Sequence, residues 1–178
     1  MSTIYTLGHS MRDLAAFSHL LQAHEIRLLE DIRAFPMSRR HPHFNRDHLE
    51  LWLPEVGTDY VWEPDLGGRR KKQIAADQSP NIALRNDSFR NYADYMLTPK
   101  FQAAVERLVE RASARRTAIM CAEQLWFRCH RMLVSDFLVA QGHTVLHILD
   151  DKPPKEHRLT QEARVVDGKL VYRGDRLL

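Results

Sequence analysis

Short apolar runs alternate with segments whose apolar residues recur at helical spacing along the first 150 residues of the chain. Runs rich in β-branched and aromatic residues predict strands over residues 4–7, 26–32, 58–62, 117–121 and 144–149. Apolar spacing of three and four predicts helices over residues 13–24, 46–55, 89–96, 100–114 and 129–141. Residues 67–88 show no strong period, and loops of that length are uncommon and often functional.

Strands that alternate with helices are typical of an α/β fold with a mostly parallel sheet. We therefore expect one α/β domain over residues 1–150, with a five-stranded sheet covered by helices on both faces. Residues 151–178 are expected to be a linker and a C-terminal β-hairpin packed on the core. The hairpin is predicted over residues 163–172, where Asp167-Gly168 supplies the turn.

This topology predicts where a binding cleft would lie. Right-handed crossovers bring the loops after residues 7, 33, 63 and 121 to one edge of the sheet. Ligands of open α/β sheets bind outside the carboxyl ends of the strands. We therefore expect a cleft lined by these four loops.

Composition and charge exclude few classes of protein. The 178 residues carry a net charge of +3, which is too small to require a nucleic-acid partner. No apolar run approaches the roughly 18 residues that span a bilayer, and no signal peptide is readable at the N-terminus. A cytoplasmic location and free thiols are therefore expected, with no membrane partner. Neither the cofactor nor the oligomeric state can be predicted.

Basic residues gather in two segments. One contains Arg33, Arg39 and Arg40, interleaved with histidines, and the other begins at Arg69 and runs to Lys72. Such clusters fit phosphate or another anionic partner, including nucleic acid. The alternative for the second cluster is a solvated basic surface without a partner.

The most distinctive chemistry lies between the fourth predicted strand and the helix after it. Cys121-Ala-Glu123 ends the strand, and Cys129-His130-Arg131 opens the helix. Helix N-termini and neighbouring cations lower thiol pKa values, so Cys129 is a candidate nucleophile and Cys121 a second one. The alternative is that both thiols are packing residues, since free cysteine is often buried.

Other residues of the converging loops are candidates for acid–base chemistry and ligand binding. Glu123, His130 and His9 could transfer protons. Guanidinium groups clamp phosphates and carboxylates, although Arg33 could instead form a buried ion pair with Asp31 or Glu123. The candidate ligand-binding residues are Arg33, Arg39, Arg40, Arg131, Ser10, Gly67, Gly68 and Arg69. A metal site is not predicted, because the Cys-x7-Cys-His spacing matches no standard zinc pattern.

Several motifs together resemble one known family. They are Gly8-His9-Ser10, the segment from Asp31 to Arg40, Leu66-Gly67-Gly68-Arg69, the two cysteine motifs, and the tail from His157. This set is similar to that of the DUF488 family, whose members are bacterial and archaeal proteins of uncharacterised function. The resemblance covers nearly the whole chain. It implies an α/β domain and gives no reaction.

Two hypotheses about function follow from these residues. The first is a small cytosolic enzyme that binds an anionic, phosphate- or nucleotide-like molecule and uses a thiol or acid–base chemistry. The second is a non-catalytic module that binds a nucleotide or nucleic acid through the arginine clusters, with cysteines that only pack.

Overall fold

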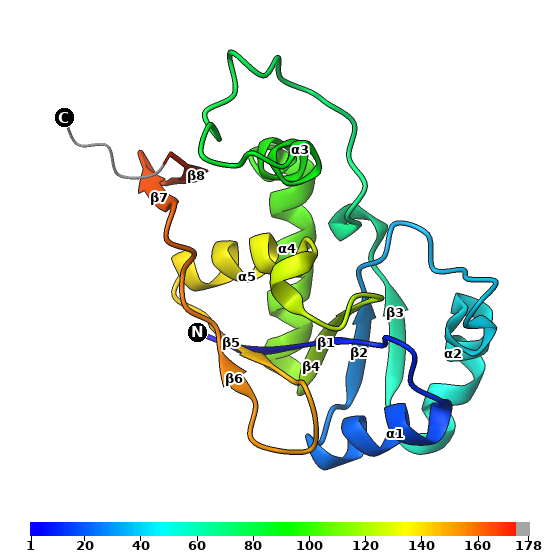
Figure 1. Cartoon of the computed structure of the whole chain (residues 1–178). Helices are drawn as coiled ribbons and strands as arrows, with labels where there is room; N and C mark the ends of the chain where they lie inside the picture. The colour runs from blue at the N-terminus through cyan, green and yellow to red at the C-terminus, as the bar shows by residue number, and fades with distance from the viewer. Residues whose placement is uncertain (174–178) are drawn as a thin grey trace.

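The computed structural model describes residues 1–173, and within them six strands form one mixed sheet (Figure 1). The order across the sheet is β3-β2-β4-β1-β5-β6. The first five strands pair in parallel, and β6 pairs antiparallel with β5. The strands are β1 (Thr3–Gly8), β2 (Leu28–Asp31), β3 (Asp59–Trp62), β4 (Thr117–Cys121), β5 (Thr144–His147) and β6 (Lys155–Glu156).

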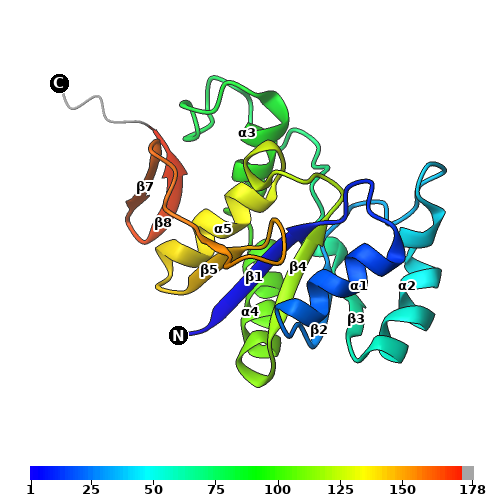
Figure 2. The ribbon, with the colours of Figure 1, turned by 60° about the horizontal axis from the view of Figure 1, so that its bottom comes forward.

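Helices cover both faces of the sheet, with α1 and α2 on one face and α4 and α5 on the other (Figures 1 and 2). The α-helices are α1 (Leu14–Ala23), α2 (Arg46–Trp52), α3 (Asp87–Tyr95), α4 (Pro99–Ala114) and α5 (Arg131–Ala140). Single 3₁₀ turns lie at η1 (Pro42–Phe44), η2 (Leu53–Val56), η3 (Pro64–Leu66) and η4 (Trp126–Arg128). None of the helices in residues 1–173 is both long and apolar enough to cross a membrane.

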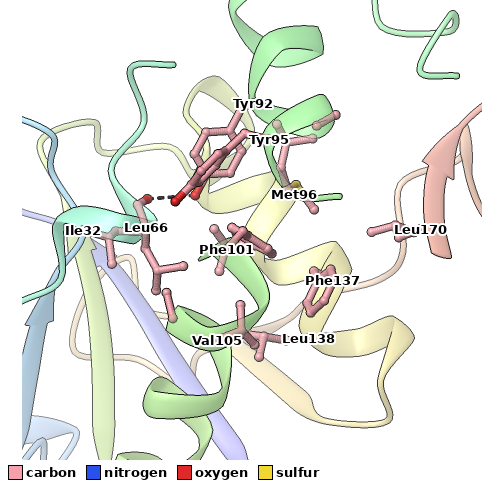
Figure 3. Packing of buried hydrophobic residues seen from close by; sticks show 14 of the residues in the cluster. Ile32, Leu66, Tyr92, Tyr95, Met96, Phe101, Val105, Phe137, Leu138 and Leu170 are labelled. Carbon is pink, nitrogen blue, oxygen red and sulfur yellow. Dashed lines mark hydrogen bonds between the residues drawn. The ribbon is translucent and has the colours of Figure 1, made fainter. Parts of the chain in front are cut away.

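Two hydrophobic cores form because the side chains of each strand alternate between the faces. On β4, Ile119 faces the helices α3, α4 and α5, while Ala118 and Met120 face α1 and α2. In the first core, shown in Figure 3, aromatic rings of α3 and α5 pack around Phe101 of α4. The hydroxyl of Tyr92 donates a hydrogen bond of 2.7 Å to the carbonyl of Leu66, which ties the loop after β3 to this core.

The predicted α/β fold is confirmed, and all five predicted strands are present. The hairpin is also confirmed as β7 (Ala163–Val166) and β8 (Lys169–Tyr172). Its two turn residues have positive φ angles of 51° and 76°, as a tight hairpin turn requires. The sheet differs from the prediction by one strand, because the segment read as a linker supplies the two-residue edge strand β6.

Candidate functional site

The loops that follow β1 and β4 run together at the carboxyl edge of the sheet. Gly8 pairs in register with Cys121, and the backbone N–H of His9 donates to the carbonyl of Cys121 at 2.9 Å. The contact is so close that a Cβ added at Gly8 would lie 1.8 Å from the carbonyl oxygen of Glu123. Gly8 therefore permits the backbone approach that brings the first motif against the cysteine motif.

A cavity of about 520 Å³ opens at this edge, and both cysteines line it. Three of the four predicted loops contribute to its wall, together with the first turns of α3. Its lining residues are Arg33, Ala34, Phe35, Met37, Gly68, Arg69, Ser88, Phe89, Tyr92, Cys121, Ala122, Glu123, Arg128, Cys129 and His130. Two cysteines, a glutamate, a histidine and three arginines thus line one cavity.

The two cysteines are free thiols whose sulfurs lie 3.0 Å apart. Arg131 Nε donates to both sulfurs, at 3.0 Å from Cys121 Sγ and 3.4 Å from Cys129 Sγ. The backbone N–H of Arg131, at the start of α5, lies 3.3 Å from Cys129 Sγ. Cys129 Sγ therefore receives donors from a thiol, a guanidinium and a helix N-terminus, which is the environment of a thiolate.

The pKa values of the two thiols shift in opposite directions. Burial opposes ionisation of Cys129, but hydrogen bonds from Cys121 and His130 and the charge of Arg131 outweigh it and lower its pKa to about 4. Burial raises the pKa of Cys121 well above its ordinary value, and the negative charge of Cys129 acts in the same direction. The pair shares one proton, which Cys121 holds in a hydrogen bond to the Cys129 thiolate.

Arg131 itself lies behind the cavity wall and is 1% exposed. Its Nη2 donates to the carbonyls of Glu123 and Gln124, and its Nη1 donates to Thr6 Oγ1 at 3.1 Å. Each of the three guanidinium nitrogens therefore has a partner within the protein. Arg131 does not line the cavity, and its charge lies beside the two thiols, so binding of a ligand by Arg131 stays a prediction.

A chain of buried hydrogen bonds continues from Arg131 across the molecule. Arg131 can only donate to Thr6, so the hydroxyl hydrogen of Thr6 is free to donate to His147 Nδ1 at 2.6 Å. His147 then carries its hydrogen on Nε2, which donates to His157 Nδ1 at 2.8 Å. His157 Nε2 donates in turn to Asp136 Oδ1 at 2.7 Å. Every bond runs in one direction, from the guanidinium to the Asp136 carboxylate.

The two histidines of this chain come from β5 and from the tail. Burial lowers the pKa of His147 to about 2, and the charge of Arg131 acts in the same direction. His147 is therefore a neutral link at ordinary pH. The tail makes a second contact with the end of this hydrogen-bond chain, because the hydroxyl of Tyr172 donates to Asp136 Oδ2 at 2.8 Å.

Arg33 forms the buried ion pair with Asp31 that the sequence allowed as an alternative. Its Nε and Nη2 bond the two carboxylate oxygens at 2.9 and 2.7 Å, and Nη2 also donates to the carbonyl of Phe44. The remaining nitrogen, Nη1, lies 3.4 Å from His9 Nε2. His9 stacks on Phe44 with ring centroids 4.4 Å apart, and burial lowers its pKa to about 4. His9 is thus a neutral imidazole buried beside Arg33, outside the lining of the cavity.

Gly68 and His130 fit closely together. His130 Nε2 is 2.8 Å from the carbonyl oxygen of Ile32, which fixes the ring against the loop after β2. A Cβ added at Gly68 would lie 2.5 Å from His130 Nδ1, and one added at Gly67 would lie 2.9 Å from Ala34 Cα. The two glycines therefore admit other parts of the protein at close range. Gly68 also lines the cavity, and binding of a ligand by either glycine stays a prediction.

Of the remaining predicted residues, some line the cavity and others lie outside it. Arg69 and Glu123 are exposed and line the cavity, and Arg69 lies over the ring of Phe35, 5.5 Å from its centroid. Arg39 and Arg40 are exposed on the loop before η1 and do not line it. Ser10 has a φ of 51° in the turn after β1 and also lies outside the lining.

Some lining residues were not predicted. Arg128 lies between the two cysteine motifs, and this position in the loop was a signal that could have identified it. Ser88, Phe89 and Tyr92 come from α3, whose sequence gives no indication that it reaches the carboxyl edge. Within residues 1–173 no three His, Cys, Asp or Glu side chains group in a way that could hold a metal ion.

Comparison with known proteins identifies the family but no individual relative. Searches of curated proteins and of solved structures found no match to the chain. A family model, described as a domain of unknown function, matches residues 13–138, which include both cysteine motifs, Arg33 and Gly67-Gly68-Arg69. The chain therefore belongs to the DUF488 family.

Proposed function

We propose that the protein is a small cytosolic enzyme in which the Cys129 thiolate attacks an anionic small molecule bound in the cavity. One observation carries this proposal. Cys129 lines the cavity, and its Sγ lies within hydrogen-bond reach of a thiol, a guanidinium and a helix N-terminus. All three favour the thiolate, which is the reactive form of cysteine.

The partners of Cys129 have distinct parts in this proposal. Cys121 keeps the shared proton off Cys129 and is placed to return it to a leaving group. Arg131 supplies the positive charge that stabilises the thiolate and is itself held by Thr6 and the carbonyls of the cysteine loop. Arg131 does not line the cavity and needs no contact with the substrate.

The anionic character of the substrate follows from the cations of the cavity. Arg69 and Arg128 line it, and neither forms an ion pair within residues 1–173. The charge of Arg33 is largely balanced by Asp31, which leaves these two side chains to bind a phosphate or a carboxylate. Phe35 is 67% exposed at the same wall and offers a face on which a planar, nucleotide-like group can stack.

The test is the pH dependence of iodoacetamide labelling at each cysteine, resolved by mass spectrometry. Trypsin cleaves after Arg116, Arg128 and Arg131, so the two cysteines fall in separate peptides, 117–128 and 129–131. An ordinary thiol of pKa about 8.5 loses most of its labelling rate between pH 8 and pH 6, whereas Cys129 should keep its rate over that range. Labelling of Cys129 only after unfolding would refute the proposal.

Binding of the anion is tested separately from thiol reactivity. Inorganic phosphate should slow the labelling of Cys129 in the wild-type protein, and this protection should weaken in Arg69→Ala and Arg128→Ala. Arg39→Ala is the matched control, because Arg39 is also exposed and does not line the cavity. Equal protection in all variants would contradict the assignment of the two arginines.

A non-catalytic module that binds nucleic acid is the second candidate. The observation in its favour is that Arg39, Arg40, Arg69, Lys71 and Lys72 are all exposed. This candidate predicts binding of a single-stranded oligonucleotide that weakens steeply with salt and is unchanged in Cys129→Ala. The enzyme predicts no such binding.

A further inference from the structure

We propose that Cys121 and Cys129 form a reversible disulfide when a hydroperoxide enters the cavity, so that the protein is a dithiol peroxidase. The inference rests on the proposed function for one point only, the reactive thiolate at Cys129. It adds the class of the oxidising substrate and a second chemical role for Cys121.

The geometry brings the sulfurs close to bonding distance. They are 3.0 Å apart, and a disulfide measures about 2.0 Å, so the sulfurs need to approach by only about 1 Å. Cys121 is held at the end of β4 by its pairing with Gly8. Cys129 lies between η4 and α5, in a connection outside regular helix or strand. A small movement of that connection is enough to close the bond.

The reaction has two steps, attack on the peroxide and closure of the disulfide, and the two thiols differ in exposure and charge as these steps require. Cys129 is the more exposed and carries the negative charge, so it attacks first. Its sulfur forms a bond to the terminal oxygen of the hydroperoxide while the O–O bond breaks. The products are a sulfenic acid on Cys129 and an alkoxide, which takes a proton from solvent to become an alcohol. Cys129 sulfur is oxidised by two electrons, and the peroxide is reduced by the same two.

Cys121 is placed to complete the reaction. It is buried and protonated, and its sulfur is the neighbour of Cys129 Sγ. Cys121 sulfur attacks the sulfenic sulfur, the S–O bond breaks, and the departing hydroxide takes the thiol proton to leave as water. The backbone N–H and Nε–H of Arg131, 3.3 and 3.4 Å from Cys129 Sγ, lie where negative charge moves between sulfur and oxygen.

The same contacts make the disulfide easy to reduce. Arg131 and its helix N-terminus stabilise the thiolate, which exists only in the reduced protein. A disulfide whose reduced form is stabilised in this way is a strong oxidant, and a low-pKa cysteine is a good leaving group. A monothiol can therefore return the pair to its starting state, as a catalytic cycle requires.

The experiment exposes the reduced protein to hydrogen peroxide at neutral pH, blocks free thiols with N-ethylmaleimide, and maps tryptic peptides without reduction. The proposal expects peptides 117–128 and 129–131 to be joined by a disulfide and to separate after treatment with glutathione. Met37 lines the cavity and is 76% exposed, so its sulfoxide reports the dose of oxidant delivered in each sample.

The matched variant is Cys121→Ser, because serine keeps a donor to the Cys129 thiolate and removes the second sulfur. At equal oxidation of Met37 it should accumulate sulfenic acid on Cys129, trapped by dimedone, and then sulfinic acid. Cys129→Ser should leave Cys121 unoxidised.

Two failures are distinguishable. If wild type and Cys121→Ser form sulfinic acid at the same rate and no cross-linked peptide appears, the dithiol proposal is overturned while a reactive Cys129 stands. If Cys129 resists both peroxide and iodoacetamide in the folded protein, the proposed function fails as well.

Discussion

The carboxylate of Asp136 offers a sharp test of the buried hydrogen-bond chain, because it is the terminal acceptor for three donors. Asp136 is fully buried on α5 and accepts from His157 Nε2, the backbone N–H of Thr160 and the hydroxyl of Tyr172 at 2.7, 2.9 and 2.8 Å. Asp136→Ala leaves all three donors without an acceptor. Breaking a buried charged network by removing one partner costs about 3–5 kcal/mol.

Asp136→Asn should cost far less, for a geometric reason. The amide oxygen can keep the bonds from His157 Nε2 and from the backbone N–H of Thr160. The amide nitrogen then faces Tyr172, whose hydroxyl can rotate and accept. The number of hydrogen bonds is preserved and the charge is lost, so we expect a loss of about 1–2 kcal/mol.

Tyr172→Phe tests the hydrogen bond of the hydroxyl while it keeps the aromatic ring in place. In the wild-type protein it removes one hydrogen bond to a charged group and should cost about 1.5–3 kcal/mol. In the Asp136→Ala background the hydroxyl has already lost its acceptor, so the same change should be neutral or stabilising. The two residues should therefore show a clear coupling in a double-mutant cycle.

Urea unfolding monitored by circular dichroism gives these free energies if the m-value is unchanged. Asp87→Ala on α3 is the control, since Asp87 is 83% exposed and its loss should fall within about 0.5 kcal/mol of wild type. Equal stability losses in Asp136→Ala and Asp136→Asn would refute the hydrogen-bond reasoning.

Three further predictions concern ionisation and close packing. Burial raises the pKa of Glu30 to about 7, so its contribution to stability is full below its ordinary pKa and is lost as pH rises through 7. Between pH 5 and pH 8, Glu30→Gln should therefore gain up to about 3 kcal/mol of stability relative to wild type, measured by urea unfolding. Parallel profiles of unfolding free energy against pH in the two proteins would contradict this. Cys121→Ala should raise the pKa of Cys129 by about 1–2 units through loss of a hydrogen bond to the thiolate, while Cys121→Ser should not; iodoacetamide labelling against pH measures both. Gly68→Ala should displace His130, because the added Cβ would lie 2.5 Å from the ring, and should lower the free energy of unfolding by about 1–3 kcal/mol. The displacement should also raise the pKa of Cys129. An unchanged labelling profile against pH would show that His130 does not support the thiolate.

The sequence predicted most of the fold because its signals are local. Apolar spacing located the five helices within a few residues, and Asp167-Gly168 located the hairpin turn. The edge strand β6 escaped prediction because two residues carry no period, and its existence depends on pairing with β5. The position of β4 between β2 and β1 is likewise a long-range property that no local pattern encodes.

The same division applies to the candidate site. Topology alone predicted that the loops after the parallel strands would meet, and three of them line the cavity. The pattern did not distinguish Arg69, which lines the cavity, from Arg39 and Arg40, which do not. Exposure of a loop side chain depends on how the loop folds, and each of these three arginines stands in a similar polar context. Binding of an anion by any of them is still a prediction.

The buried chain links the thiols to parts of the protein that a motif search would treat as peripheral. Asp136 and Arg131 belong to α5, but Thr6, His147, His157 and Tyr172 lie outside the segment that matches the family model. A guanidinium is held in one orientation only when its donors meet fixed acceptors, and the acceptor Thr6 is itself oriented by its donation to His147. The position of Arg131 beside the two sulfurs therefore depends on a hydrogen bond between Thr6 and His147, which are 141 positions apart in sequence. By this reasoning the tail helps to set the acidity of Cys129, although none of its residues up to Arg173 lines the cavity that Cys129 lines.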